Sequence, residues 1–140
     1  MGLPTSLKTT WTAPYSRSIE LDPKFAYAYS ERGEAYSLNK DFDRAMADTN
    51  RAIELDPKFA IAYVLRGFVH ANKKDHDSAI DYNRAIEINP KLAIAYVNRG
   101  VTYANKGHNK SAIADNRKSL ELDPKNTVAR DGLKRLGLTH

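Results

Sequence analysis

The chain has 140 residues, no cysteine and a formal net charge of +5. This length suits one domain with a continuous core, and a chain without cysteine has no disulfides, thiolate nucleophiles or thiolate metal ligands. No apolar run approaches the roughly 18 residues that a membrane span needs, and the N-terminus lacks the apolar core of a secretory signal. We therefore expect a cytoplasmic protein with no membrane segment.

The first 18 residues precede the regular part of the sequence. Residues 13–20 (APYSRSIE) resemble the end of the helix that we expect at 42–55, yet no partner helix precedes them and Pro14 would interrupt helical hydrogen bonds. We expect residues 1–18 to be a truncated repeat or disordered, and residues 19–138 to form the folded domain.

Three near-identical blocks follow at an almost constant interval. They open with LDPKFAYAY at Leu21, LDPKFAIAY at Leu55 and INPKLAIAY at Ile88, and a fourth opening, LDPKN, starts at Leu122. Successive openings lie 34, 33 and 34 residues apart. Such a period is typical of a solenoid, in which each unit buries its apolar face against its neighbours.

Each block predicts two helices. An Asp-Pro or Asn-Pro pair favours a helix start, because the Asx side chain caps the helix and proline needs no hydrogen bond at the first position. A short polar turn then separates the two helices, which requires them to be antiparallel. In the final, capping helix we expect Val128, Leu133 and Leu136 to face inward. The first helices are expected at about residues 24–38, 58–72 and 91–105, the second at about 42–55, 76–88 and 109–122, and the capping helix at 127–138.

Small residues recur where the helices of a unit are expected to touch. Glycine in a helix interior costs about 1 kcal/mol relative to alanine, so its return at one register in every unit indicates closely packed helices. Alanine recurs in the same way on the second helix. The small residues are Gly33, Gly67 and Gly100 on the first helices, and Ala45, Ala79 and Ala112 on the second.

The pattern of each unit resembles the tetratricopeptide repeat. A large aromatic residue is followed four residues later by glycine, an alanine lies on the second helix, and proline closes the unit, as in Tyr29, Gly33, Ala45 and Pro57. The resemblance covers three repeats, at about residues 26–59, 60–92 and 93–126. It implies an all-α fold, a right-handed α-solenoid of three helix-turn-helix repeats plus the C-terminal capping helix, and a scaffold for protein–protein interaction that is not an enzyme.

An arginine precedes the glycine of each first helix, where the family usually has leucine. An inward-facing arginine is tolerable only when it is paired, and an aspartate recurs in step on each second helix. We therefore expect ion pairs within each repeat in preference to an anion-binding site. The expected partners are Arg32 with Asp48, Arg66 with Asp81, and Arg99 with Asp115.

The second repeat is one residue shorter than the others. Counting forward from Gly67 places Ala79 in the small-residue position of its second helix, whereas counting back from the closing proline places Ser78 there and turns Ile80 outward. One residue corresponds to about 100° of helix rotation. We expect the turn to absorb the missing residue and the packing over residues 78–82 to be poor.

The family resemblance implies that the first helices line a concave groove. Apolar residues predominate in the second and third repeats, and an exposed apolar patch usually marks an interaction site. We expect a protein or peptide ligand, such as an amphipathic helix laid in the groove. The predicted groove residues are Tyr27, Glu34, Ile61, Val64, Phe68, Asn72, Ile94, Val97, Asn98, Val101 and Asn105.

Some members of the family bind the acidic C-termini of heat-shock chaperones through a clamp of Lys, Asn and Arg. None of the corresponding residues is basic here, and Glu34 would repel a carboxylate, so we do not expect this ligand. The corresponding residues are Ser30, Glu34, Leu65, Ile94 and Asn98.

Two other functions remain open. A homo-oligomer could bury the groove or the N-terminal surface. Nucleic-acid binding is less favoured, because residues 106–140 carry 8 Lys/Arg against 4 Asp/Glu, an excess that also suits a solvated end-cap. No catalytic or nucleotide-binding motif occurs, and the histidines show no metal-ligand spacing. We therefore predict no catalytic, cofactor-binding or metal-ligating residues and no cofactor.

Overall fold

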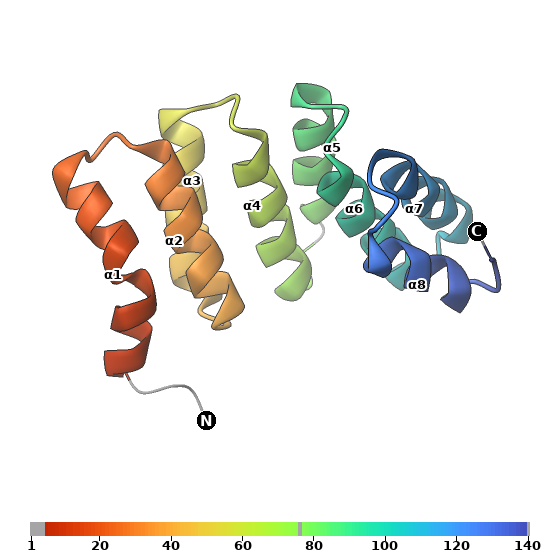
Figure 1. Cartoon of the computed structure of the whole chain (residues 1–140), viewed down its shortest axis with the longest axis horizontal. Helices are drawn as coiled ribbons and strands as arrows, with labels where there is room; N and C mark the ends of the chain where they lie inside the picture. Colours follow the sequence, from red (N-terminus) through yellow and green to blue (C-terminus); the bar gives the residue numbers. More distant parts are fainter. Residues whose placement is uncertain (1–4, 76, 140) are drawn as a thin grey trace.

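The structure is a computed structural model that describes residues 5–75 and 77–139, with side chains from Trp11 onward. Within these residues every regular element is a helix, as the sequence predicts, and the helices follow one another in chain order along the array (Figure 1). They are α1 (Thr5–Leu21), α2 (Ala26–Leu38), α3 (Phe42–Leu55), α4 (Ala60–Asn72), α5 (Ser78–Ile88), α6 (Ala93–Asn105), α7 (Asn109–Leu122) and α8 (Thr127–Arg135).

The helices form two layers. Within the repeats α2 packs on α3, α4 on α5 and α6 on α7, and each pair packs on the next. Successive first helices also contact one another, α2 with α4, α4 with α6 and α6 with α8, whereas successive second helices in the described chain do not. The layer of α2, α4, α6 and α8 therefore lies on the inner side of a curved solenoid, and we call it the inner layer.

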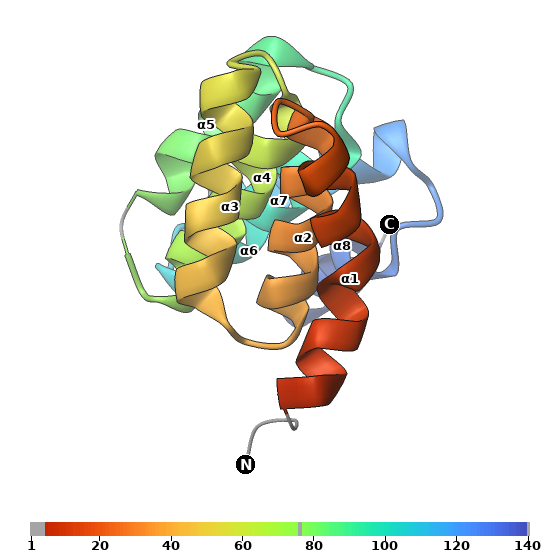
Figure 2. The ribbon, with the colours of Figure 1, turned by 90° about the vertical axis from the view of Figure 1, so that its left-hand side faces the viewer.

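The N-terminal segment is helical from Thr5 to Leu21. Residues 1–4 lie outside the described residues. Helix α1 packs on α2 in the way that α3 packs on α4, and it thus takes the place of a second helix in the array. The end view in Figure 2 shows α1 at the front of the array. Pro14 lies inside α1 with its ring exposed.

The Asx-Pro pairs lie just outside the helices that they were expected to start. Asp56 Oδ1 accepts a hydrogen bond from the amide of Lys58 at 3.1 Å, and the same turn recurs at the other three openings. The Asx side chain therefore stabilises a turn rather than a helix end, and α4 begins two residues later than expected. The phenol of Tyr63 donates to the carbonyl of Pro57 at 3.0 Å, which ties the helix back to that turn.

The shortened second repeat is absorbed at the start of α5, as we expected of the turn. Helix α5 has 11 residues, whereas α3 and α7 have 14. Ser78 is buried in the small-residue position and Ile80 is 65% exposed, so the assignment of Ala79 to that position is wrong. The prediction of poor packing is also wrong for the buried side chains of this segment, since Tyr82 is 1% exposed.

Tyr82 belongs to the main buried apolar cluster, which joins the second repeat to the third. The ring lies directly over Gly67, the glycine of the same repeat. Other side chains of the cluster come from α4, α5 and α6, so the core is continuous between neighbouring repeats. The buried members are Tyr63, Val64, Tyr82, Ala85 and Ala95.

Helix α2 contains a buried hydroxyl without a partner among the described residues. Ser30 occupies the position that Val64 and Val97 take in the other repeats; it is fully buried, and its Oγ has no hydrogen-bond partner among the described residues. A buried polar group without a partner is destabilising.

Replacing Ser30 with alanine should therefore raise the free energy of unfolding, by about 1 kcal/mol, in urea denaturation followed by circular dichroism. Ser119 is the matched control. It is equally buried, but its hydroxyl donates to the carbonyl of Ala93 and accepts from Asn126, so Ser119→Ala should be destabilising. A loss of stability in Ser30→Ala would show that its hydroxyl has a partner after all.

Candidate functional site

The inner layer presents apolar side chains to solvent. Phe68 of α4 is 38% exposed and Ile94 of α6 is 46% exposed, and Tyr27 and Val101 are similarly open. Among the polar residues predicted for the groove, Glu34, Asn72 and Asn105 are exposed and Asn98 is half-buried; the apolar Ile61 is also half-buried. Nine of the eleven predicted groove residues are thus at least partly accessible on the inner layer.

Val64 and Val97 are the two exceptions. They are 2% and 3% exposed, and Val64 packs with Tyr82 and Ala95 in the apolar core. Neither is therefore an exposed groove residue, although Val64 still lines a pocket of the inner layer. An acidic residue at either position would test the stability of the core rather than binding.

A pocket of about 190 Å³, the central pocket, lies where α2, α4 and α6 meet. Its surface is mainly apolar, with Val64 at its floor and polar side chains at its rim. Residues of all three helices line it: Glu34, Ser37, Leu38, Val64, Leu65, Phe68, Ile94 and Asn98.

A second pocket of about 170 Å³, the C-terminal pocket, lies between α6 and α8. Val101, Val128 and Leu136 supply apolar walls, and Arg135 and Asp131 lie beside them. Val128 is 54% exposed, so the prediction that it faces inward is wrong for this side chain. Leu133, by contrast, is buried as predicted.

Asn116 of α7 also lines the C-terminal pocket. Its side chain is 2% exposed, and its Oδ1 has no hydrogen-bond partner among the described residues. Gly100 and Gly132 allow α6 and α8 to approach it, because a Cβ at Gly132 would lie 2.6 Å from Asn116 Nδ2. We did not assign α8 to the groove from the sequence, although the LDPKN opening before it marks it as a fourth first helix.

The charged residues of the inner layer are unevenly distributed. Glu31 and Glu34 lie one helical turn apart on α2, and neither has an ion pair within 4.0 Å among the described residues. Burial, and then the charge of Glu34, raise the pKa of Glu31 above its ordinary value of 4.5. At the other end of the layer, Arg135 of α8 likewise has no ion pair in the described chain.

The three repeated arginines are engaged within the fold, as predicted. Arg99 contacts both carboxylate oxygens of Asp115 at 2.8 Å and donates through Nη1 to Asn83 of the preceding repeat at 2.8 Å. The hydrogen bonds with Asp115 raise the pKa of Arg99 above its usual range. Arg32 and Arg66 form the equivalent pairs, so none of these guanidinium groups is available to an anion.

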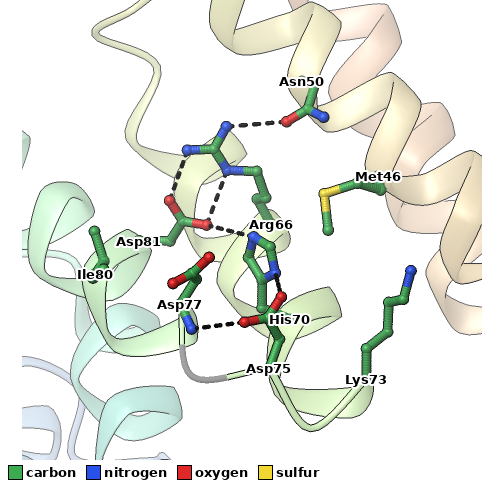
Figure 3. Close-up of a pocket in the computed structure, with 9 residues that line it drawn as sticks. All are labelled: Met46, Asn50, Arg66, His70, Lys73, Asp75, Asp77, Ile80 and Asp81. Carbon is green, nitrogen blue, oxygen red and sulfur yellow. Dashed lines mark hydrogen bonds and ion pairs between the residues drawn. The ribbon is translucent and has the colours of Figure 1, made fainter.

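A larger pocket, of about 570 Å³, opens on the other face of the array between α3 and α5 (Figure 3). His70 Nδ1 lies 3.1 Å from Asp75 Oδ2, and Asp75 Oδ1 accepts from the amide of Asp77. Ligand atoms of these three residues lie within 4.8 Å of one another, a spacing that suits a cation. The hydrogen bonds among these three residues stabilise the turn that leads into α5, which explains why they lie together. Asp81 beside them is paired with Arg66.

In the part of the chain that the structure describes, no helix has the length and apolar character needed to cross a bilayer.

Models of the tetratricopeptide repeat match residues 26–59, 60–92 and 82–114. The chain belongs to the tetratricopeptide repeat family. This family provides scaffolds for protein interaction and is generally non-enzymatic, so the chain is a protein-interaction module. A comparison with curated proteins found no match.

The fold is similar to solved tetratricopeptide structures. The Arabidopsis OM64 TPR domain is 28% identical, with 79% of this chain and 93% of that chain covered and a TM-score of 0.74. MamA is 29% identical, with 83% and 68% covered and a TM-score of 0.69. The first TPR of Spaghetti (RPAP3), solved with the HSP90 peptide SRMEEVD, is 24% identical, with 80% and 90% covered and a TM-score of 0.75, a likeness of fold alone.

Proposed function

We propose that the chain binds a segment of a partner protein along its inner layer, without catalysing a reaction. The central pocket carries this proposal, because Phe68 and Ile94 stay exposed around a mainly apolar hollow instead of packing in the core. Its volume corresponds to about six water molecules, which is room for an apolar side chain of a ligand. Clustered exposed apolar side chains with a polar rim are typical of interaction sites.

The charge of the surface around the central pocket argues against an acidic C-terminal peptide as the ligand. Leu65 and Ile94 are apolar, and Glu34 lies at the rim of the central pocket. Ser30, at a further position of the family clamp, is buried. An apolar segment, extended or folded as an amphipathic helix, is a better match for this wall.

A displayed library of random peptides, selected on the purified protein, tests the proposal. We expect the selected peptides to lose affinity for Phe68→Glu by about tenfold or more, equal to about 1.4 kcal/mol, because the charge would lie in the apolar pocket. Isothermal titration of the selected peptides measures this loss. Phe68 is exposed enough for the substitution to leave the fold intact.

Ile80→Glu is the matched control, since Ile80 is an exposed apolar residue that lies outside the groove, beside the pocket between α3 and α5. It should bind the peptides normally. Equal losses in both variants, or none in Phe68→Glu, would contradict the proposal. Light scattering on the same proteins tests whether a second copy of the chain occupies the groove. If the native protein is an oligomer that Phe68→Glu dissociates, the ligand of the groove is this second copy and not a partner's peptide.

A further inference from the structure

We propose that the groove selects segments that carry a basic group at one end and an acidic group at the other, with apolar side chains between them. The basic group would lie against Glu31 and Glu34 of α2, and the acidic group against Arg135 of α8. This inference rests on the proposed function, since it describes which segment the same inner layer recognises.

The acidic end lies on the first inner helix. Glu34 lines the central pocket directly, and Glu31 takes the position at which Leu65 and Asn98 line that pocket from the next two inner helices. The two carboxylates lie one helical turn apart and repel each other; burial, and then the charge of Glu34, raise the pKa of Glu31. The nearby guanidinium of Arg32 is already committed to Asp48.

No other inner helix carries such a pair. The positions of Glu31 and Glu34 are occupied by Leu65 and Phe68 in α4, and by neutral residues in α6. A ligand cation would thus find a pair of carboxylates at the α2 end, and it would relieve the repulsion between them.

The basic end lies on the last inner helix. Arg135 lines the C-terminal pocket, and no ion pair joins it to Asp131, its neighbour one turn earlier and the other charged residue of that pocket. With Arg130 and Lys134, α8 carries three basic residues against this one acid. An arginine fork suits a carboxylate through two hydrogen bonds.

The buried amide of Asn116 adds a second polar feature to this end. Its Oδ1 lacks a partner among the described residues although the side chain is almost fully buried. A ligand amide or hydroxyl placed in the C-terminal pocket beside Val101 and Leu136 would supply the missing hydrogen bond. The pocket therefore combines a free acceptor, a free guanidinium and apolar walls.

The distance between the two ends sets the length of the ligand. Packed helices lie about 8–10 Å apart, so the four inner helices span about 25–30 Å. An α-helical ligand would cover this distance with roughly 20 residues at 1.5 Å each, and an extended one with roughly nine residues. Because charges across an interface mainly determine specificity and orientation, the two ends would align the ligand in one direction along the groove.

Sequencing of the peptides selected from a library of roughly 20-residue members tests the inference. On the native protein we expect Lys or Arg to be enriched at one end of the peptides and Asp or Glu at the other. On the variant Glu31→Lys/Glu34→Lys, acidic residues should be enriched at both ends, and on Arg135→Glu, basic residues at both ends. Glu87→Lys, on α5 outside the groove, is the control and should select the native pattern.

The outcomes separate this inference from the proposed function. Peptides that depend on Phe68 but show no difference in charge between their ends would overturn the inference and leave the proposed function standing. The inference would likewise be overturned, and the proposed function left standing, if the charge-reversed variants select peptides with the same charges at their ends as the native protein does. If no selected peptide has an affinity that depends on Phe68, both the inference and the proposed function would be overturned.

Discussion

Replacing Gly67 with alanine should lower the free energy of unfolding by about 2 kcal/mol, since overpacking a dense core costs 1–3 kcal/mol. The new Cβ would lie 2.7 Å from Tyr82 Cε1 and 3.1 Å from the carbonyl oxygen of Ser78. Tyr82 is 1% exposed and enclosed by the core, so the ring has no room to move away. Urea denaturation followed by circular dichroism measures the change.

The same substitution in the first repeat is the control. At Gly33 the nearest atoms would be Thr49 Cγ2 at 3.2 Å and Asp48 Cβ at 3.3 Å, and the better helix propensity of alanine, worth about 1 kcal/mol, offsets this mild crowding. Gly33→Ala should thus be nearly neutral. Tyr82→Thr should reduce the penalty of Gly67→Ala in the double variant. Equal losses at Gly33 and Gly67 would show that crowding by Tyr82 is not the cause.

Replacing Arg99 with alanine should destabilise the protein by about 2–3 kcal/mol. Removal of one partner from a buried ion pair costs about 3–5 kcal/mol, and the 20% exposure of the Arg99 side chain reduces this figure. The variant would leave Asp115, which is 5% exposed, without its bidentate partner and would remove the contact with Asn83. Thermal and urea denaturation measure the loss.

Arg66→Ala provides a comparison within the same protein. His70 Nε2 lies 3.6 Å from Asp81 Oδ2, so Asp81 keeps a neighbouring polar group when Arg66 is removed. The corresponding residue of the third repeat is Tyr103, which forms no ion pair. We therefore expect a smaller loss from Arg66→Ala than from Arg99→Ala, and the reverse order would argue against this role for His70.

The arginine pairs also affect the proposed groove. Each joins an inner helix to the second helix of its own repeat and, through Nη1, to the second helix before it. Arg99 lies 5.7 Å from the ring centroids of Tyr96 and Tyr103, which adds cation–π contacts. These links hold successive repeats at fixed positions, and a preorganised wall loses less conformational freedom when a ligand binds.

Several features of the site could be predicted because they recur in the sequence. The aspartate that follows each arginine on the second helix predicted the pairs of Arg32, Arg66 and Arg99, since two groups that recur in step face each other in every unit. The accessible groove residues followed from the same register. The C-terminal pocket was missed because α8 matches the repeat only in its opening letters and has Lys134 where the other first helices have glycine.

The sequence by itself determined the period, the antiparallel helix pairs and the ion pairs, because these depend on residue types at short, repeated spacings. Only the tertiary structure decided that Val64 and Val97 are buried, that Ser78 replaces Ala79 in the core, and that α8 extends the inner layer. Burial depends on how one repeat packs against the next, and a shift of one residue turns a helical side chain by about 100°. A periodic pattern within one unit does not contain that information.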